Sequence, residues 1–531
     1  MPTTPPAGAT ASDVPQITPE PALPSEGLQW PAQPVAYEVN TAVWLREIAR
    51  RAGSAVTLGD VPPAEWDAVV PNGVNVVWLM GVWERSLVGR AIALDNPGLR
   101  AAWSSALPDW SPADVAGSPY CIRDYTPDAA VGGWAGIDAA REQLRARGAC
   151  LMLDWVPNHV GPDSPWLADE PDAFVRGTAE ELARQPDAFV SVGGEVFARG
   201  KDPYFAPWPD VVQVNAFATG LRKVAGQALA RIAEHADAVR CDMAMLMLDD
   251  VVTATWGGRV GPAPATTYWQ ELTEAAKAAN PRFTFVAEAY WDREWDLQQL
   301  GFDHCYDKRL YDRLEQGDPA PVRDHLRADV DYQRGLVRFL ENHDEPRAAR
   351  TFPPRERGQA YAAALATLPG LTLWHEGQAD GRQISLPVFL SRRPDEPLDR
   401  DLADWYRRLW VAAAAVRQGR WSRRDVLGWP DNTSAQRLVA WTWTDGERLS
   451  LTVVNLGGEA ADGVVQLDRD RMLGREWLLT DLLDGATYER SGDDLAEHGL
   501  YVSRPGWATH VFRVTPLNAD AVTRDEGGGR R

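Results

Sequence analysis

Eight apolar runs of strand length recur between residues 36 and 374, and the stretches between them are longer and often amphipathic. Strands that alternate with helical stretches are typical of parallel sheets, because the helix carries the chain back to the start of the next strand. Eight such units predict an α/β fold, a closed (β/α)8 barrel of the TIM type. The predicted strands span residues 36–39, 75–80, 149–155, 238–242, 283–288, 302–306, 337–340 and 371–374.

Two intervening stretches carry a helical pattern. In residues 134–147 the apolar side chains of Ile137, Ala140 and Leu144 recur at helical spacing, and residues 221–236 follow a similar pattern. The segment between the third and fourth predicted strands, about 160–220, is too long for an ordinary barrel loop. We therefore predict an inserted subdomain there. Its aromatic and proline-rich part, 202–208, fits either a wall over a cleft or a packed surface excursion.

The pattern changes after the eighth strand. A helical stretch, 402–417, precedes short segments of alternating hydrophobicity, and Asp445-Gly446 between two of them is a hairpin signal. We interpret residues 28–419 as the catalytic barrel and 420–516 as a C-terminal antiparallel β-sandwich. Residues 1–27 are predicted to be a disordered leader without signal-peptide character, and 517–531 a disordered tail.

Charge and cysteine content limit the partners. The chain has 54 Lys and Arg residues against 75 Asp and Glu residues, so its net charge of -21 disfavours nucleic acid and anionic membranes. No apolar run approaches the roughly 18 residues of a membrane span. We therefore expect a neutral substrate. The four cysteines lie far apart, which predicts free buried thiols and a cytoplasmic setting.

Polar groups stand at the carboxyl ends of predicted strands, where barrel enzymes place their active sites. Arg240 and Asp242 alternate with Cys241, so both should point into the barrel mouth. We expect the arginine to lower the pKa of Asp242, as a nucleophile requires. Taken alone, an Arg-x-Asp on a strand is more often a structural ion pair.

Two further carboxylates occupy equivalent positions. Glu288 ends an almost wholly apolar run, and apolar surroundings raise the pKa of a carboxyl group toward that of a general acid. Asp344 lies in the polar cluster 341–345 after the seventh strand, a density of polar groups that packing does not explain. Asn158 and His159 follow the third strand, where they could hold sugar hydroxyls. Singly each residue has a structural explanation, but their joint placement favours a catalytic site.

Taken in order, these segments resemble the conserved regions of the alpha-amylase family of retaining glycoside hydrolases. The resemblance implies that Asp242 is the nucleophile, Glu288 the general acid/base and Asp344 a carboxylate that stabilises the transition state. It also implies that Tyr120, in Gly117-Ser118-Pro119-Tyr120, stacks under the sugar bound by Arg240, His159 and His343. The matching segments are 154–159 (D-x-V-x-N-H), 239–243 (R-x-D), 287–290 (the glutamate) and 342–344 (N-H-D).

Three positions depart from the family pattern. Members that bind structural calcium use the asparagine at Asn158 and an aspartate in the insertion, where this chain has Gln213, so calcium is doubtful and we expect no cofactor. Met245-Leu246 replace a Lys-His pair common in alpha-amylases, and alanine precedes Glu288 where glycine is common. These departures leave the substrate open.

Three functions remain compatible with the sequence. The leading one is a glycosidase that cleaves α-glucosidic bonds in α-glucans or maltooligosaccharides by double displacement through a covalent glycosyl-enzyme. Its expected partner is a neutral oligosaccharide or polysaccharide substrate. The second keeps the same site but transfers or isomerises the sugar, as an α-glucanotransferase, maltosyltransferase or sugar isomerase would. The third is a catalytically silent glucan-binding protein, which would have no need to retain all three carboxylates.

Overall fold

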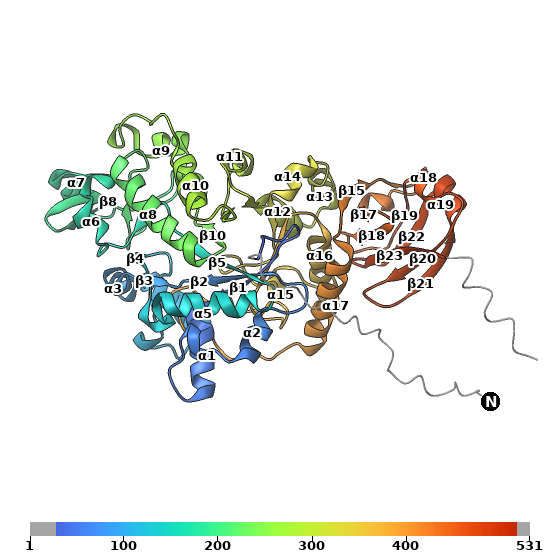
Figure 1. The fold of residues 1–531 in the computed structure, drawn as a ribbon, viewed down its shortest axis with the longest axis horizontal. Coiled ribbons are helices and arrows are strands. Elements are labelled where there is room, and N and C mark those ends of the chain that lie inside the picture. The colour runs from blue at the N-terminus through green and yellow to red at the C-terminus, as the bar shows by residue number, and fades with distance from the viewer. Residues whose placement is uncertain (1–27, 518–531) are drawn as a thin grey trace, which may run out of the picture.

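The computed structural model describes residues 28–517, so the predicted leader and all but the first residue of the predicted tail lie outside it (Figure 1). Eight parallel strands close a barrel in the order β1-β14-β13-β12-β11-β10-β5-β2. Each of the eight apolar runs forms one of them, which confirms the predicted fold class. The barrel strands are β1 (Val35–Asn40), β2 (Val76–Met80), β5 (Cys150–Trp155), β10 (Ala238–Cys241), β11 (Thr284–Ala287), β12 (His304–Tyr306), β13 (Leu336–Arg338) and β14 (Leu371–His375).

Helices cover the barrel with their apolar faces. In α8 (Thr219–His235) the buried face contains Leu221, Ala225, Leu229 and Ile232, spaced to lie on one side of the helix. A capping box at Thr267 begins α10 (Tyr268–Ala279), which packs against α8. The other long covering helices are α1 (Thr41–Ala52), α5 (Gly133–Arg145), α12 (Lys308–Gln316), α16 (Arg355–Thr367) and α17 (Arg400–Val416).

Shorter elements occupy the connections. Between β2 and β5 the chain forms two helices and a small antiparallel pair that the sequence pattern did not predict. The remaining elements are α2 (Pro63–Val69), β3 (Trp83–Arg85), α3 (Leu87–Asp95), α4 (Pro97–Ala106), β4 (Ile122–Pro127), α9 (Asp249–Trp256), α11 (Glu294–Gln299), α13 (Pro319–His325), α14 (Val330–Arg334) and α15 (Ala348–Thr351).

The segment between β5 and α8 folds into short pieces at the end of the molecule away from the C-terminal region (Figure 1). A two-stranded pair, β6 (His159–Val160) with β9 (Val212–Gln213), joins it to the barrel mouth. A hairpin of β7 (Phe189–Val192) and β8 (Glu195–Ala198) extends from it. Two short helices, α6 (Trp166–Asp169) and α7 (Ala179–Arg184), complete the insertion.

Two antiparallel sheets form the C-terminal region. One has the order β15-β17-β18-β23-β20-β21 and the other β16-β19-β22. Asp445 pairs with Arg448 across the predicted hairpin, where Gly446 takes the positive φ of 54° that such turns need. The elements are β15 (Arg420–Arg424), β16 (Val426–Leu427), β17 (Leu438–Asp445), β18 (Arg448–Asn455), β19 (Ala461–Val465), α18 (Arg469–Met472), β20 (Glu476–Asp481), β21 (Thr487–Ser491), α19 (Gly492–His498), β22 (Leu500–Arg504) and β23 (Thr509–Leu517).

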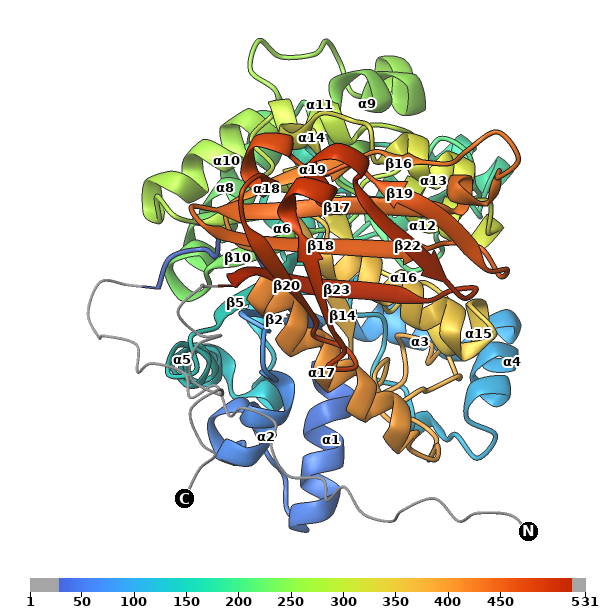
Figure 2. The same ribbon diagram turned by 90° about the vertical axis from the view of Figure 1, so that its right-hand side faces the viewer.

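The sandwich is joined to the barrel by a continuous core. Helices α16 and α17 lie between them, behind the sheets in the view of Figure 2. Trp421, Trp441 and Trp443 belong to the same buried cluster as the barrel residues. Nε1 of Trp443 donates to the carbonyl oxygen of Thr367 at the end of α16, at 2.7 Å. The two parts therefore share buried apolar surface as well as a hydrogen bond.

Two features bear on the setting of the protein. All four cysteines are buried and free, as predicted. Within residues 28–517 no helix is long and apolar enough to cross a membrane. The cytoplasmic setting stays a prediction.

Candidate active site

Three carboxylates meet at the carboxyl ends of the barrel strands. Asp242 directly follows β10 and Glu288 directly follows β11, two strands that are neighbours in the barrel. Asp344 lies in the loop after β13. One guanidinium connects the three groups, because Arg240 is wholly buried among them.

The contacts of Arg240 define the center of the site. Its Nη1 donates to Oδ1 of Asp242 at 2.9 Å, and its Nη2 lies 2.8 Å from Oε2 of Glu288. Oδ2 of Asp344 lies farther away, 4.0 Å from Nη2. The guanidinium carbon also lies over the rings of three aromatic side chains, Trp78 at 5.2 Å, Tyr120 at 5.3 Å and Tyr306 at 5.6 Å. A buried cation held in this way fixes the positions of the carboxylates around it.

Arg240 lowers the pKa of Asp242, as expected, but the net pKa of Asp242 is raised because burial is the larger effect. Burial of Asp242 raises its pKa above the usual value, and the attraction and hydrogen bond of Arg240 only partly offset that rise. The negative charge of Asp344 raises the pKa further. The net pKa of a carboxylate beside an arginine falls below its usual value only where the arginine outweighs desolvation. Here the carboxyl side chain is only 11% exposed, so desolvation is the larger effect.

Glu288 has the pKa of a general acid. Burial, together with the charges of Asp242 and Asp344, raises its pKa to about 6 despite the opposing attraction of Arg240. Two donors bind its carboxyl oxygens: the backbone N–H of Met243 donates to Oε2 at 2.6 Å, and the hydroxyl of Tyr290 donates to Oε1 at 2.7 Å. Met243 has a φ of 38°, which is uncommon outside glycine and costs about 1–3 kcal/mol.

A chain of charged groups positions Asp344. His343 lies between two carboxylates, with Nδ1 2.5 Å from Oε1 of Glu38 and Nε2 2.9 Å from Oδ2 of Asp344. Burial disfavours the charged imidazole, but the two carboxylates outweigh that effect and hold the pKa of His343 well above its usual value. Burial likewise opposes ionisation of Asp344, yet His343 and Arg240 lower its pKa to about 2. Asp344 is therefore ionised, and its side chain is 47% exposed.

The residues predicted to bind sugar lie around this cluster. The hydroxyl of Tyr120 is 2.7 Å from Nε2 of His343, and the two rings are stacked with centroids 5.3 Å apart. His159 donates from Nε2 to the backbone oxygen of Tyr120 at 3.2 Å. Burial lowers the pKa of His159 to about 4, so its ring is neutral at pH 7. The structure brings Tyr120, His159, Arg240 and His343 together beside the carboxylates.

Aromatic side chains from the insertion reach the loop that follows Glu288. Tyr204 packs edge-on against Trp291, with ring centroids 4.9 Å apart. Tyr204 and its neighbor Phe205 are 69% and 73% exposed. Trp208 packs against His159, with ring centroids 5.2 Å apart. The 202–208 segment therefore forms an exposed aromatic edge beside the loop that follows Glu288.

The residues that could hold calcium do not fit that ion. Nε2 of Gln213 donates to Oδ1 of Asn158 at 2.9 Å, and Nδ2 of Asn158 lies 3.3 Å from Oε1 of Gln213. Both amides are buried and bind each other, and neither supplies the charge that hard cations favour. No group of three or more His, Cys, Asp or Glu side chains in residues 28–517 is arranged to hold a metal ion.

Several residues of the site escaped the sequence-based prediction. Glu38 is a single acid within an apolar strand, and Tyr290 is an aromatic residue two positions after Glu288. A buried charge inside a barrel strand is a usable signal, because such a charge needs a partner. Tyr306 and Trp78, which line Arg240, have no such signal because aromatic residues on strands are ordinary core residues.

The protein belongs to the class of (β/α)8-barrel proteins that carry an appended β-sandwich. Its carboxylate cluster lies at the carboxyl ends of the barrel strands, where barrel enzymes have their active sites. No protein-family model matches the chain. It is 25% identical over 390 residues to the alpha-amylase MalA of Haloarcula japonica, covering 70% of this chain. It spans only about half, 52%, of that relative.

Solved structures share the fold. A maltogenic alpha-amylase, AmyB from Thermotoga neapolitana, superposes with a TM-score of 0.63 at 20% identity, covering 91% of this chain and 99% of that one. The cyclic alpha-maltosyl-(1→6)-maltose hydrolase of Arthrobacter globiformis gives a TM-score of 0.60 at 16% identity, covering 93% and 100%. The predicted resemblance to the alpha-amylase family is confirmed, because the chain is similar in sequence to an alpha-amylase and similar in fold to solved structures of that kind.

Proposed function

We propose that this protein is a retaining glycosidase that cleaves α-glucosidic bonds in α-glucans or maltooligosaccharides. The observation that carries the proposal is the arrangement around Arg240, which binds Asp242 and Glu288 through the two terminal nitrogens of one guanidinium. The two carboxyl groups are therefore close neighbours. Retaining enzymes need a short separation of about 5 to 5.5 Å, whereas inverting enzymes leave room for a water molecule.

The proposed reaction has two displacements. Asp242 attacks the anomeric carbon while Glu288 gives its proton to the departing glycosidic oxygen, which leaves as a hydroxyl group. The bond to the leaving sugar is replaced by an ester bond to Asp242. Glu288, now ionised, takes a proton from water, and the resulting hydroxyl group attacks the anomeric carbon and releases Asp242.

The different environments of the three carboxyl groups support these roles. A pKa of about 6 leaves Glu288 protonated in a useful fraction of molecules near neutral pH, as a general acid requires. Asp344, with its pKa lowered to about 2, is a permanent anion that can accept hydrogen bonds from sugar hydroxyls. Asp242 is paired with Arg240, which favours the ionised form that attacks.

Transfer to a second sugar is the alternative with an observation in its favour. The covalent intermediate reacts with any hydroxyl group that outcompetes water. The exposed edge formed by Tyr204, Phe205 and Trp291 offers aromatic faces on which an acceptor sugar could stack. The silent glucan-binding alternative gains no such support, because three carboxylates meet at one guanidinium.

Digestion of maltoheptaose separates these functions. A hydrolase releases only products shorter than the substrate, whereas a transferase also forms products longer than the substrate from the start. The Asp242→Asn variant should lose at least about a thousandfold in turnover with its fold intact, because the attacking carboxylate is gone. Asp470→Asn, which alters an exposed carboxylate of the sandwich, serves as the control. Activity of Asp242→Asn equal to the parent protein would refute the assignment.

A further inference from the structure

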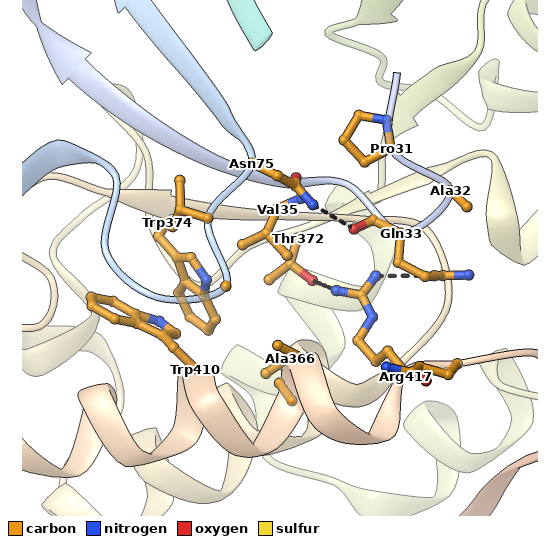
Figure 3. A pocket seen from close by; sticks show the side chains of 15 residues that line it. Pro31, Ala32, Gln33, Val35, Asn75, Ala366, Thr372, Trp374, Trp410 and Arg417 are labelled. Atoms are coloured by element: carbon orange, nitrogen blue, oxygen red, sulfur yellow. Dashed lines mark hydrogen bonds between the residues drawn. The ribbon is translucent and has the colours of Figure 1, made fainter. Parts of the chain in front are cut away.

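A cavity lies at the end of the barrel opposite the carboxylates, where the strands begin. It has a volume of about 370 Å³, within the range of small-molecule sites. Residues 31–33, the amino ends of β1, β2 and β14, and one face of α17 line it (Figure 3). Because the carboxylate cluster lies at the carboxyl ends of the same strands, this cavity is separate from the proposed active site.

Arg417 is the single charged residue that lines the cavity. It is only 4% exposed, and its hydrogen bonds go to neutral acceptors. Nη1 donates to Oγ1 of Thr372 at 3.0 Å, and Nη2 donates to the carbonyl oxygen of Gly370 at 2.5 Å. A longer contact of 3.4 Å joins Nη2 to Oε1 of Gln33.

The charge of Arg417 is not balanced within the described part of the chain. No carboxylate of residues 28–517 forms an ion pair with it, and its buried Nε has no hydrogen-bond partner. Burial lowers its pKa to about 10, without an acidic group to oppose that effect. Buried charges in proteins are normally paired, because transfer of an unpaired ion out of water is costly. The guanidinium therefore has a vacant position for an anion.

The rest of the lining is apolar and aromatic. Figure 3 shows the indole rings of Trp374 and Trp410 on one side of the view and Arg417 with Gln33 on the other. The two indole rings lie 6.3 Å apart with an interplanar angle of 53°. Nε1 of Trp410 is a second buried donor without a partner. Both vacant polar atoms are donors, so the lining suits a ligand with an apolar body and an acceptor group.

We propose that this cavity binds a small organic acid, with its carboxylate on Arg417 and a flat apolar body against Trp374 and Trp410. A planar carboxylate matches the guanidinium in shape and supplies the one negative charge that balances it. A single guanidinium without a second cation suits a monoanion better than a phosphate ester. This binding does not depend on the glycosidase function.

The test compares charged and neutral probes of the same shape. Binding of phenylacetate, indoleacetate and their amides to the full-length protein is measured by calorimetry. We expect at least one of the two acids to bind, at least tenfold more tightly than its amide. Failure of both acids to bind, or equal binding of acid and amide, would overturn the proposal.

Three variants locate the site. Arg417→Met keeps the length of the side chain but removes the charge, so the preference for the acid over the amide should disappear. Ala414→Phe adds bulk at an exposed position of α17 that lines the cavity, and it should block both probes without disturbing the core. Val411→Phe adds the same bulk at an exposed position of the same helix outside the cavity and should bind like the parent protein. Unchanged binding in Ala414→Phe would place the probe elsewhere and contradict the proposal, even where Arg417→Met fails to fold.

Discussion

Nη1 of Arg240 donates to Oδ1 of Asp242 at 2.9 Å, yet the pKa of Asp242 is raised rather than lowered. The same guanidinium binds Glu288 at 2.8 Å, so one positive charge is shared by two buried acids. The cation therefore limits a rise in pKa that burial causes, and it holds the two carboxyl groups beside each other.

Removal of Arg240 should cost both stability and activity. In Arg240→Met the buried carboxylates lose their cation, and breaking a buried ion pair from one side costs about 3–5 kcal/mol. Urea unfolding at pH 7 measures this loss. The deficit should shrink as the pH falls, because protonated carboxyl groups no longer need the cation. A deficit that stays constant from pH 7 to pH 5 would contradict this explanation.

The alkaline limb of the pH profile should report Glu288. The acid donates its proton only below its pKa of about 6, so kcat/KM should fall about tenfold per pH unit above that value. In Tyr290→Phe the carboxylate loses the donor at 2.7 Å that stabilises its charged form. The pKa of Glu288 should rise, and the limb should move to higher pH. Tyr501→Phe, on the exposed surface of the sandwich, is the control and should leave the limb in place. A limb that moves to lower pH in Tyr290→Phe would count against the assignment of the limb to Glu288.

Glu38 is expected to keep His343 charged. In Glu38→Gln one of the two anions beside the imidazole is lost, so the pKa of His343 should fall. NMR titration of the imidazole measures that change directly. A neutral His343 should position Asp344 less well for substrate, so KM should increase. At low pH His343 is charged with or without Glu38, and this increase in KM should therefore appear only as the pH rises. Glu84→Gln, which alters a surface pair with Arg123, should leave both properties unchanged. An unaltered titration of His343 in Glu38→Gln would show that the contact has no electrostatic role.

The hydrogen bond of Trp443 should stabilise the junction of barrel and sandwich. Trp443→Phe leaves the buried carbonyl of Thr367 without its donor, which costs about 1–3 kcal/mol. Trp421→Phe is a matched control, because Trp421 is buried in the same core and its Nε1 has no partner. Thermal unfolding should show a larger loss for Trp443→Phe than for Trp421→Phe. Equal losses would mean that packing alone joins the two parts.

The barrel could be predicted because its strands are nearly continuous apolar runs. β2 and β5 are buried along their whole length, as strands of a parallel barrel are, and each run therefore stands out from its amphipathic neighbours. Helices α3 and α4 were not predicted. Both helices lie in the connection between β2 and β5, outside the regular alternation of barrel strand and covering helix on which the prediction was based.

The positions of the three carboxylates could also be predicted, because each follows an apolar run. Their protonation could not. The pKa of Asp242 depends on how deeply the fold buries it, and that depth is a tertiary property. The positive φ of Met243 is equally invisible, because nothing in a methionine indicates a left-handed backbone. Glu38 lies about 300 positions before His343, and only the closed barrel brings the two together.

The covalent intermediate provides the most direct test of the proposed mechanism. A fluorinated α-glycosyl fluoride, which forms the glycosyl-enzyme faster than water can release it, should trap the protein as an ester, and peptide mapping by mass spectrometry identifies the labelled residue. The mechanism predicts one added sugar on Asp242 and none in Asp242→Asn. A label on another carboxylate, or turnover of natural substrate with inverted configuration and no trapped ester, would contradict it.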